Sequence, residues 1–132
     1  MIARYSRPEM AGLWTPESRY QAWLDVELRA CEANTKLGLI PRRALATIKR
    51  RAAFSIKRID ELERVVKHDV IAFLTAVGEK VGPESRFIHL GLTSSDVLDT
   101  SLALLMQKAA DIIIADIRGL LSVLRKQAHR YK

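Results

Sequence analysis

The stretch "SSDVLDTSLALLMQKAADIIIADIRGLLSVLRKQAHRYK" (residues 94–132) contains no proline and a single glycine, Gly119. Its apolar residues recur at three-four spacing, from Leu98 through Ile112 to Leu124. This is the pattern of an apolar face on an α-helix. At 1.5 Å rise per residue the helix would be roughly 55 Å long, which is longer than a domain of this size is wide.

The apolar stripe of this helix is wider than the seam of a two-stranded coiled coil, because Ile112, Ile113 and Ile114 follow one another and Leu120 precedes Leu121. Such a helix needs neighbours on more than one side. We therefore expect the chain either to oligomerise through it or to belong to a longer protein. The final "LRKQAHRYK" has no Gly, Pro or cap, which favours the longer protein.

The start of the helix, "HLGLTSSDVLDT", is unusually polar. Thr93 followed three residues later by Asp96 is close to a capping box. The cap does not explain Ser94, Ser95 or His89. Backbone N–H groups and hydroxyls at a helix N-terminus also suit an anion, so on the residues alone a structural cap and an anion site are both open.

Four shorter helices, and no strand, are predicted before residue 94. They begin at Thr15-Pro16, at Pro41, at Ser55 and at His68-Asp69; Gly38 ends the first and Gly82 the fourth. Residues 84–93 are expected to form a connector. The chain is therefore predicted to be all-α.

The composition predicts a soluble, cytoplasmic protein. Cys31 is the single cysteine and cannot form an internal disulfide, which favours a reducing compartment and a small buried side chain. No signal-type N-terminus is visible, and no run of ~18 apolar residues that would span a membrane.

The net charge of +7 predicts an anionic partner. From Lys36 to Arg58 there are eight Lys or Arg and no acidic residue. No helix-turn-helix spacing or RNA-binding aromatic motif accompanies this basic stretch. We expect a solvated face rather than a nucleic-acid site.

The histidines do not form a metal set, because HExxH and clustered cysteines are absent. "VKHDVIAF" places His68 and Asp69 at a helix junction beside Lys67. A histidine there can donate to phosphate or relay a proton, although a lone histidine is more often structural. The same two interpretations apply to His89, whereas His129 is expected to be solvated.

The N-terminal "ARYSRPEM" places Arg4, Tyr5 and Arg7 ahead of any predicted helix. Arginine beside an aromatic ring suits a phosphate and a base. A short arm normally frays, so the residues alone favour a basic tail.

"MIARYSRPEM", "KHDVIAF" and "HLGLTSSDVLDT", in this order and at these spacings, resemble the N-terminal part of the adenylosuccinate lyase family of the fumarase/aspartase superfamily. The resemblance covers the whole chain and implies an all-α homotetramer. Residues 1–93 would be a small N-terminal helical domain, and residues 94–132 the start of the central bundle of long helices. The implied reaction eliminates fumarate from adenylosuccinate, giving AMP, and from the succinylated aminoimidazole carboxamide ribotide, without metal or organic cofactor.

The resemblance also implies substrate-binding residues: Arg4, Tyr5, Lys67, His68, Asp69, Thr93 and Ser94. Arg4 and Tyr5 match the nucleotide-binding arm, and His68 and Asp69 a substrate contact near the phosphate or the reacting centre. Thr93 and Ser94 match the pair that holds the dicarboxylate.

Two further positions qualify this assignment. Lys67 stands where the family more often has arginine, which weakens the case for a bidentate phosphate contact. His89 lies in the connector and is a possible active-site residue, like His68.

The family's general acid, a later histidine, and its general base, a serine in an "SSxMPxKxNP" loop, have no counterpart in this sequence. Each active site of the family is built from three subunits. We therefore expect this chain to be inactive by itself. The alternatives are another superfamily lyase, such as argininosuccinate lyase, and a helical oligomerisation or nucleic-acid-binding module.

Overall fold

The computed structural model describes residues 2–132, which form helices and no strand. The elements, with η marking a 3-10 helix, are η1 (Ala3–Tyr5), α1 (Pro8–Leu13), α2 (Pro16–Lys36), α3 (Arg42–Arg51), α4 (Ile56–Val66), α5 (Asp69–Val81), η2 (Pro83–Phe87) and α6 (Ser94–Arg130). The predicted all-α class is confirmed. Within this range no helix is long and apolar enough to cross a bilayer.

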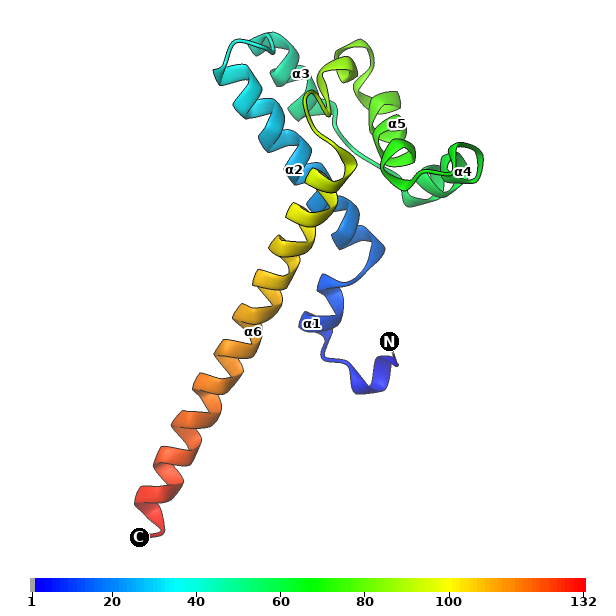
Figure 1. Cartoon of the computed structure of the whole chain (residues 1–132). Coiled ribbons are helices and arrows are strands. Elements are labelled where there is room, and N and C mark those ends of the chain that lie inside the picture. The colour runs from blue at the N-terminus through cyan, green and yellow to red at the C-terminus, as the bar shows by residue number, and fades with distance from the viewer. Residues whose placement is uncertain (1) are drawn as a thin grey trace.

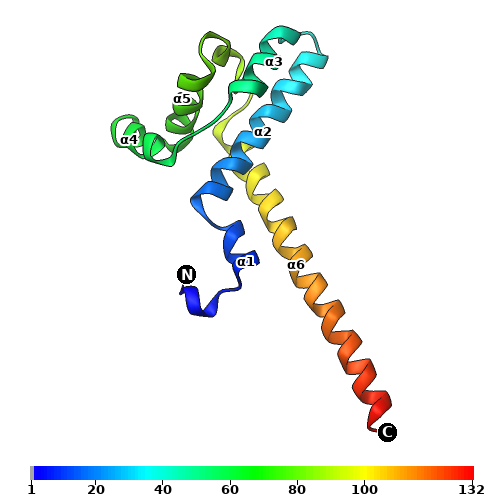
Figure 2. The same cartoon turned by 180° about the vertical axis from the view of Figure 1, so that it is seen from behind.

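The chain forms a compact head from which α6 projects as a rod (Figure 1). Helix α2 packs against the first part of α6, and α4 packs against α5. Helix α1 lies beside α6 below the head, as the view from behind also shows (Figure 2). The C-terminus is at the far end of the rod.

Aromatic side chains at the centre of the head join α2 to α5. The Tyr20 ring meets the Trp23 ring edge-on at 5.1 Å between centroids and stacks on Phe73 at 5.8 Å. Phe54, which precedes α4, lies 6.2 Å from Phe73. Rings in such contact stabilise a core beyond their buried area, so this cluster fixes where the N-terminus of α5 lies relative to α2.

The burial of α6 stops halfway along the helix. Val97, Ser101, Leu105 and Ala109 are buried at every fourth position, facing the head and α1. Beyond them Ile112 is half-buried, and the large apolar residues from Ile113 onward are exposed, with an exposed fraction of 54% for Leu124. The shorter helices therefore cover only the first part of α6.

Several predicted helix ends are confirmed. The Ser18 N–H donates to the Thr15 hydroxyl at 3.2 Å at the start of α2, and Gly38 and Gly82 adopt positive φ after α2 and α5. Ser55 precedes α4 as predicted, but its side chain makes no capping hydrogen bond. The prediction that Ser55 caps α4 was therefore wrong, and the packing of α4 against α5 holds this helix instead.

The prediction that the N-terminal arm precedes any helix was also wrong. Residues 3–5 form η1 and residues 8–13 form α1, with Pro8 in the first turn. A six-residue helix is not stable alone in water. It forms here because it packs on α6, where the Arg7 guanidinium pairs with the Asp116 carboxylate.

Candidate functional site

The predicted capping box at the start of α6 is present. The Thr93 N–H donates to Asp96 Oδ2 at 2.7 Å, and the Asp96 N–H donates to Thr93 Oγ1 at 3.4 Å. The Thr93 hydroxyl also donates to Oδ2 at 3.0 Å. The bonds from Thr93 hold the pKa of the Asp96 carboxyl below its usual range. The bond from the Thr93 backbone N–H has the largest effect, and the bond from the Thr93 hydroxyl follows. The Thr93 side chain is therefore committed to the cap.

The two serines that follow are not needed for the cap. Ser94 is half-buried in the first turn of α6, and Ser95 is exposed. Within residues 2–132 neither hydroxyl takes part in the capping bonds of α6. The Ser94 hydroxyl is thus available beside the free backbone N–H groups of the first turn.

His89 is held by a residue that the sequence analysis missed, Glu27 of α2. The His89 N–H donates to Glu27 Oε2 at 2.9 Å, and His89 Nδ1 lies 2.6 Å from Glu27 Oε1. The Glu27 side chain is 1% exposed and the His89 side chain 19%. The sequence signal for Glu27 was that it lies four residues after Trp23 and four before Cys31, on the core-facing side of α2.

The His68 region forms the start of α5. The Ile71 N–H approaches His68 Nδ1 at 3.5 Å, a long contact, and the Val70 N–H donates to Asp69 Oδ1 at 2.7 Å. Lys67 ends α4 in the left-handed conformation. The side chains of His68 and Asp69 remain about half exposed, so they can contact a ligand.

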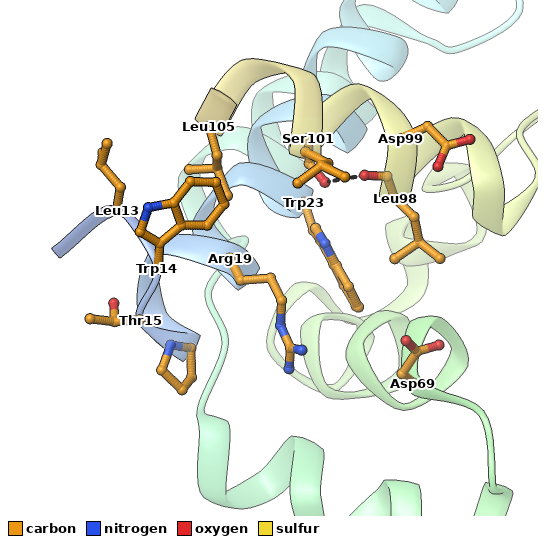
Figure 3. Close-up of a pocket in the computed structure, with 12 residues that line it drawn as sticks. Leu13, Trp14, Thr15, Arg19, Trp23, Asp69, Leu98, Asp99, Ser101 and Leu105 are labelled. Atoms are coloured by element: carbon orange, nitrogen blue, oxygen red, sulfur yellow. Dashed lines mark hydrogen bonds between the residues drawn. The ribbon is translucent and has the colours of Figure 1, made fainter. Parts of the chain in front are cut away.

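A cleft of about 400 Å³ lies between the α1–α2 junction, the start of α5 and α6 (Figure 3). Among the described residues that line it, Asp69 is the one that the sequence analysis predicted for the site. The Arg19 guanidinium lies 5.4 Å from the centre of the Trp23 ring within it. The other side chains of the wall are Leu13, Trp14, Thr15, Pro16, Leu98, Asp99, Ser101, Leu102 and Leu105.

The nucleotide arm lies apart from this end of α6. The Arg4 guanidinium lies 4.8 Å from the centre of the Tyr5 ring, and Tyr5 shares a cavity of about 260 Å³ with Ile112 of α6. Ile112 follows Ser94 by 18 positions, which is roughly 27 Å along a helix. The structure therefore separates Tyr5 from Ser94 within one chain.

The basic stretch from Lys36 to Arg58 is partly neutralised. Lys49 pairs with Glu32 at 2.7 Å, and Arg58 pairs with Glu79 at 2.7 Å and with Glu61 at 3.0 Å. These acidic residues lie outside the stretch in sequence. The pairing weakens the nucleic-acid alternative. No group of His, Cys, Asp or Glu within residues 2–132 could hold a metal ion.

Comparison with known proteins gives consistent matches. The family described as "Lyase" matches residues 3–132. The adenylosuccinate lyase of Bacillus subtilis is 46% identical over the whole chain, and that of Synechocystis sp. is 52% identical over 99% of it. The adenylosuccinate lyase of Aquifex aeolicus is 46% identical over the whole chain. The chain spans 31% of the length of each of these relatives.

Solved structures share the fold. The 3-carboxy-cis,cis-muconate lactonizing enzyme of Pseudomonas putida superposes with a TM-score of 0.85 at 30% identity, over 94% of this chain and 30% of that one. A fumarate lyase from Mesorhizobium sp. superposes with a TM-score of 0.77 at 23% identity, over 89% of this chain and 29% of that one. The second likeness concerns the fold alone.

Proposed function

This chain belongs to the lyase family, and from that premise we propose that it is the substrate-holding N-terminal part of an adenylosuccinate lyase. The enzyme would release fumarate from adenylosuccinate, giving AMP, and from the succinylated aminoimidazole carboxamide ribotide of purine synthesis. The observation that carries the proposal is 46–52% identity to three adenylosuccinate lyases over essentially the whole chain. The enzyme would act in the cytoplasm.

The dicarboxylate part of the substrate binds at the start of α6. The Ser94 hydroxyl and the first-turn N–H groups donate to a carboxylate, supported by the positive end of the helix dipole. Thr93 contributes mainly by closing the cap that orients Ser94, because its side chain is bound to Asp96. His89 faces the same ligand from the connector.

The nucleotide part binds to Arg4 and Tyr5, which hold the phosphate and the base. Lys67, His68 and Asp69 contribute from the start of α5, where Asp69 lines the cleft with Leu98 of α6 and not the cavity beside Tyr5. One nucleotide cannot touch both Tyr5 and Ser94 of the same chain, given their separation along α6. The proposal therefore places residues of different copies in one site, which fits a homotetramer.

The exposed half of α6 supports such an assembly. Ile113, Ile117 and Leu120 are each at least half exposed, although the N-terminal arm reaches this part of α6, where Arg7 pairs with Asp116. An apolar stripe of this length is stable in water when other helices cover it. We assign residues 1–93 to an N-terminal helical domain and residues 94–132 to the start of a helical bundle shared between copies.

The reaction is a β-elimination. A base removes a proton from the succinyl carbon beside the one bonded to nitrogen, the C–N bond breaks, and an acid protonates the leaving nitrogen. The electrons of the C–H bond become the double bond of fumarate. The residues of this chain hold the substrate, and the principal acid and base come from elsewhere in the assembly. The isolated chain is then inactive.

Binding measurements on the complete gene product test these assignments. Ser94→Ala should weaken adenylosuccinate binding about tenfold, the loss of one hydrogen bond to a charged group, and should leave AMP binding unchanged. Arg4→Ala should weaken both ligands. Ser95→Ala is the matched control, because it removes the adjacent exposed hydroxyl.

Two results would redirect the proposal. Equal losses for Ser94→Ala and Ser95→Ala would remove Ser94 from the site. Tight binding of argininosuccinate, with none of adenylosuccinate or AMP, would favour the alternative lyase of the same superfamily.

A further inference from the structure

A buried carboxylate holds His89 at two points. Glu27 Oε2 accepts the His89 backbone N–H at 2.9 Å, and Glu27 Oε1 lies 2.6 Å from the ring nitrogen Nδ1. Glu27 is one of the few polar residues in the buried set, at 1% exposure. A charged group is seldom buried unless it is paired, so His89 is the partner that permits Glu27 to stay in the head.

The contact between Glu27 and the His89 ring is not required to hold the connector in place. The bond to the backbone N–H alone would fasten the connector to α2, and any residue at position 89 would supply it. His89 also adopts a positive φ of 65°, a backbone region in which histidine is more common than most residues other than glycine. What the imidazole adds at this position is therefore the bond between Nδ1 and Glu27 Oε1.

We propose that Glu27 is a positioning residue for His89: its Oε1 accepts a hydrogen bond from Nδ1–H, which fixes the tautomer and leaves Nε2 to face the substrate. This inference rests on the proposed function, because it takes His89 to contact the nucleotide substrate. An ionised carboxylate can only accept hydrogen bonds, so Nδ1 carries the proton. A protonated Nε2 donates to an anionic group, and an unprotonated one accepts a proton.

The neighbouring charges suit this role. The charge of Asp96 at the start of α6 lies close enough to interact with His89, and on α2 the thiol of Cys31 feels the charge of Glu27. Glu27 is the acidic residue in direct contact with the ring. One carboxylate therefore sets the ring orientation.

The tautomer of His89 can be measured on this chain by nitrogen-15 NMR of the imidazole rings at a pH where they are neutral. The expected spectrum has the proton on Nδ1 and an unprotonated Nε2. A proton on Nε2, or an equal mixture, overturns the inference. This measurement uses the wild-type chain, so it tests the inference even if a substitution at Glu27 prevents folding.

Two substitutions on α2 sharpen the test. Glu27→Gln should shift the proton from Nδ1 to Nε2, because the amide oxygen accepts the His89 backbone N–H and the NH2 group then donates to an unprotonated Nδ1. Asp25→Asn is the matched control: it removes the same charge on the same helix, from a carboxylate that, among residues 2–132, is hydrogen-bonded by the side chain of Gln21 alone. An unchanged tautomer in Glu27→Gln overturns the inference.

Adenylosuccinate affinity of the complete gene product separates positioning from folding. Glu27→Gln should weaken binding about tenfold, and Asp25→Asn should not. In a His89→Ala background Glu27→Gln should cost nothing further, since coupled residues are not additive. Additive losses overturn the inference. If His89→Ala binds normally, the inference fails while the proposed function stands; if the wild type binds no adenylosuccinate, the proposed function fails as well.

Discussion

Thr93 and Asp96 accept hydrogen bonds from each other's backbone N–H groups at the start of α6. The Asp96 N–H lies 3.4 Å from Thr93 Oγ1, and the Thr93 N–H lies 2.7 Å from Asp96 Oδ2. The cap thus uses one threonine and one aspartate of the polar stretch that begins at His89. His89 is held separately by Glu27, and the Ser94 hydroxyl is left for a ligand. The cap and the proposed binding site therefore share the same short segment.

The cap should be measurable as stability. Thr93→Ala removes the acceptor for the Asp96 N–H and should lower the free energy of unfolding by about 1 kcal/mol. Urea denaturation measures this difference. Ser95 is exposed in the same first turn of α6, and Ser95→Ala should change the free energy of unfolding by less than half as much. Equal effects would show that the capping box does not stabilise α6.

The same cap should give the protein a dependence on acid. The pKa of Asp96 is lowered in the folded state by the Thr93 N–H and hydroxyl. The stabilisation is therefore present above the unfolded-state pKa of an aspartate and is lost as the pH falls through the lower folded-state pKa. Wild type should be more stable than Asp96→Asn at neutral pH, and the difference should shrink on acidification. A constant difference contradicts this.

Cys31 should be unreactive in the folded chain. Burial, and then the charges of Glu27 and Glu32, raise the pKa of the Cys31 thiol to about 11. Because the thiolate is the nucleophile, alkylation by iodoacetamide at pH 8 should be at least about a hundredfold slower than in the unfolded chain. Mass spectrometry measures the rate. Similar rates in urea and in buffer would contradict the burial.

The exposed half of α6 should drive self-association. Replacing Ile117 and Leu124 together by glutamate should lower the molecular mass measured by sedimentation, because it places charges in the apolar stripe. Replacing Arg118 and Arg125 by glutamate, also on the exposed half of α6, is the matched control. If both variants sediment alike, the stripe is not the interface.

Much of the fold could be predicted because its signals are local. Pro16, Gly38 and the three-four spacing after residue 94 each act within one or two turns, and the structure has α2 and α6 there. Helix α1 could not be predicted in this way. Its stability comes from packing on α6, and its Arg7 pairs with Asp116, 109 residues away.

The candidate site likewise contains local contacts that the sequence predicts and long-range contacts that it does not. Thr93 and Asp96 were recognisable because the partners of a capping box lie three positions apart. The contact between Glu27 and His89 spans 62 residues, and no spacing rule links them. The position of Glu27 between Trp23 and Cys31 indicates a core-facing side of its helix, but its contact with His89 is visible only in the structure.

Fumarate release from adenylosuccinate, measured side by side for the complete gene product and for the 132-residue chain, tests the central claim most directly. We predict that the complete product forms fumarate and AMP in equal amounts, and that the chain alone forms no more than its Ser94→Ala variant. A complete gene product that releases no fumarate from either succinylated nucleotide, or an isolated chain that releases it above that control, would contradict the account.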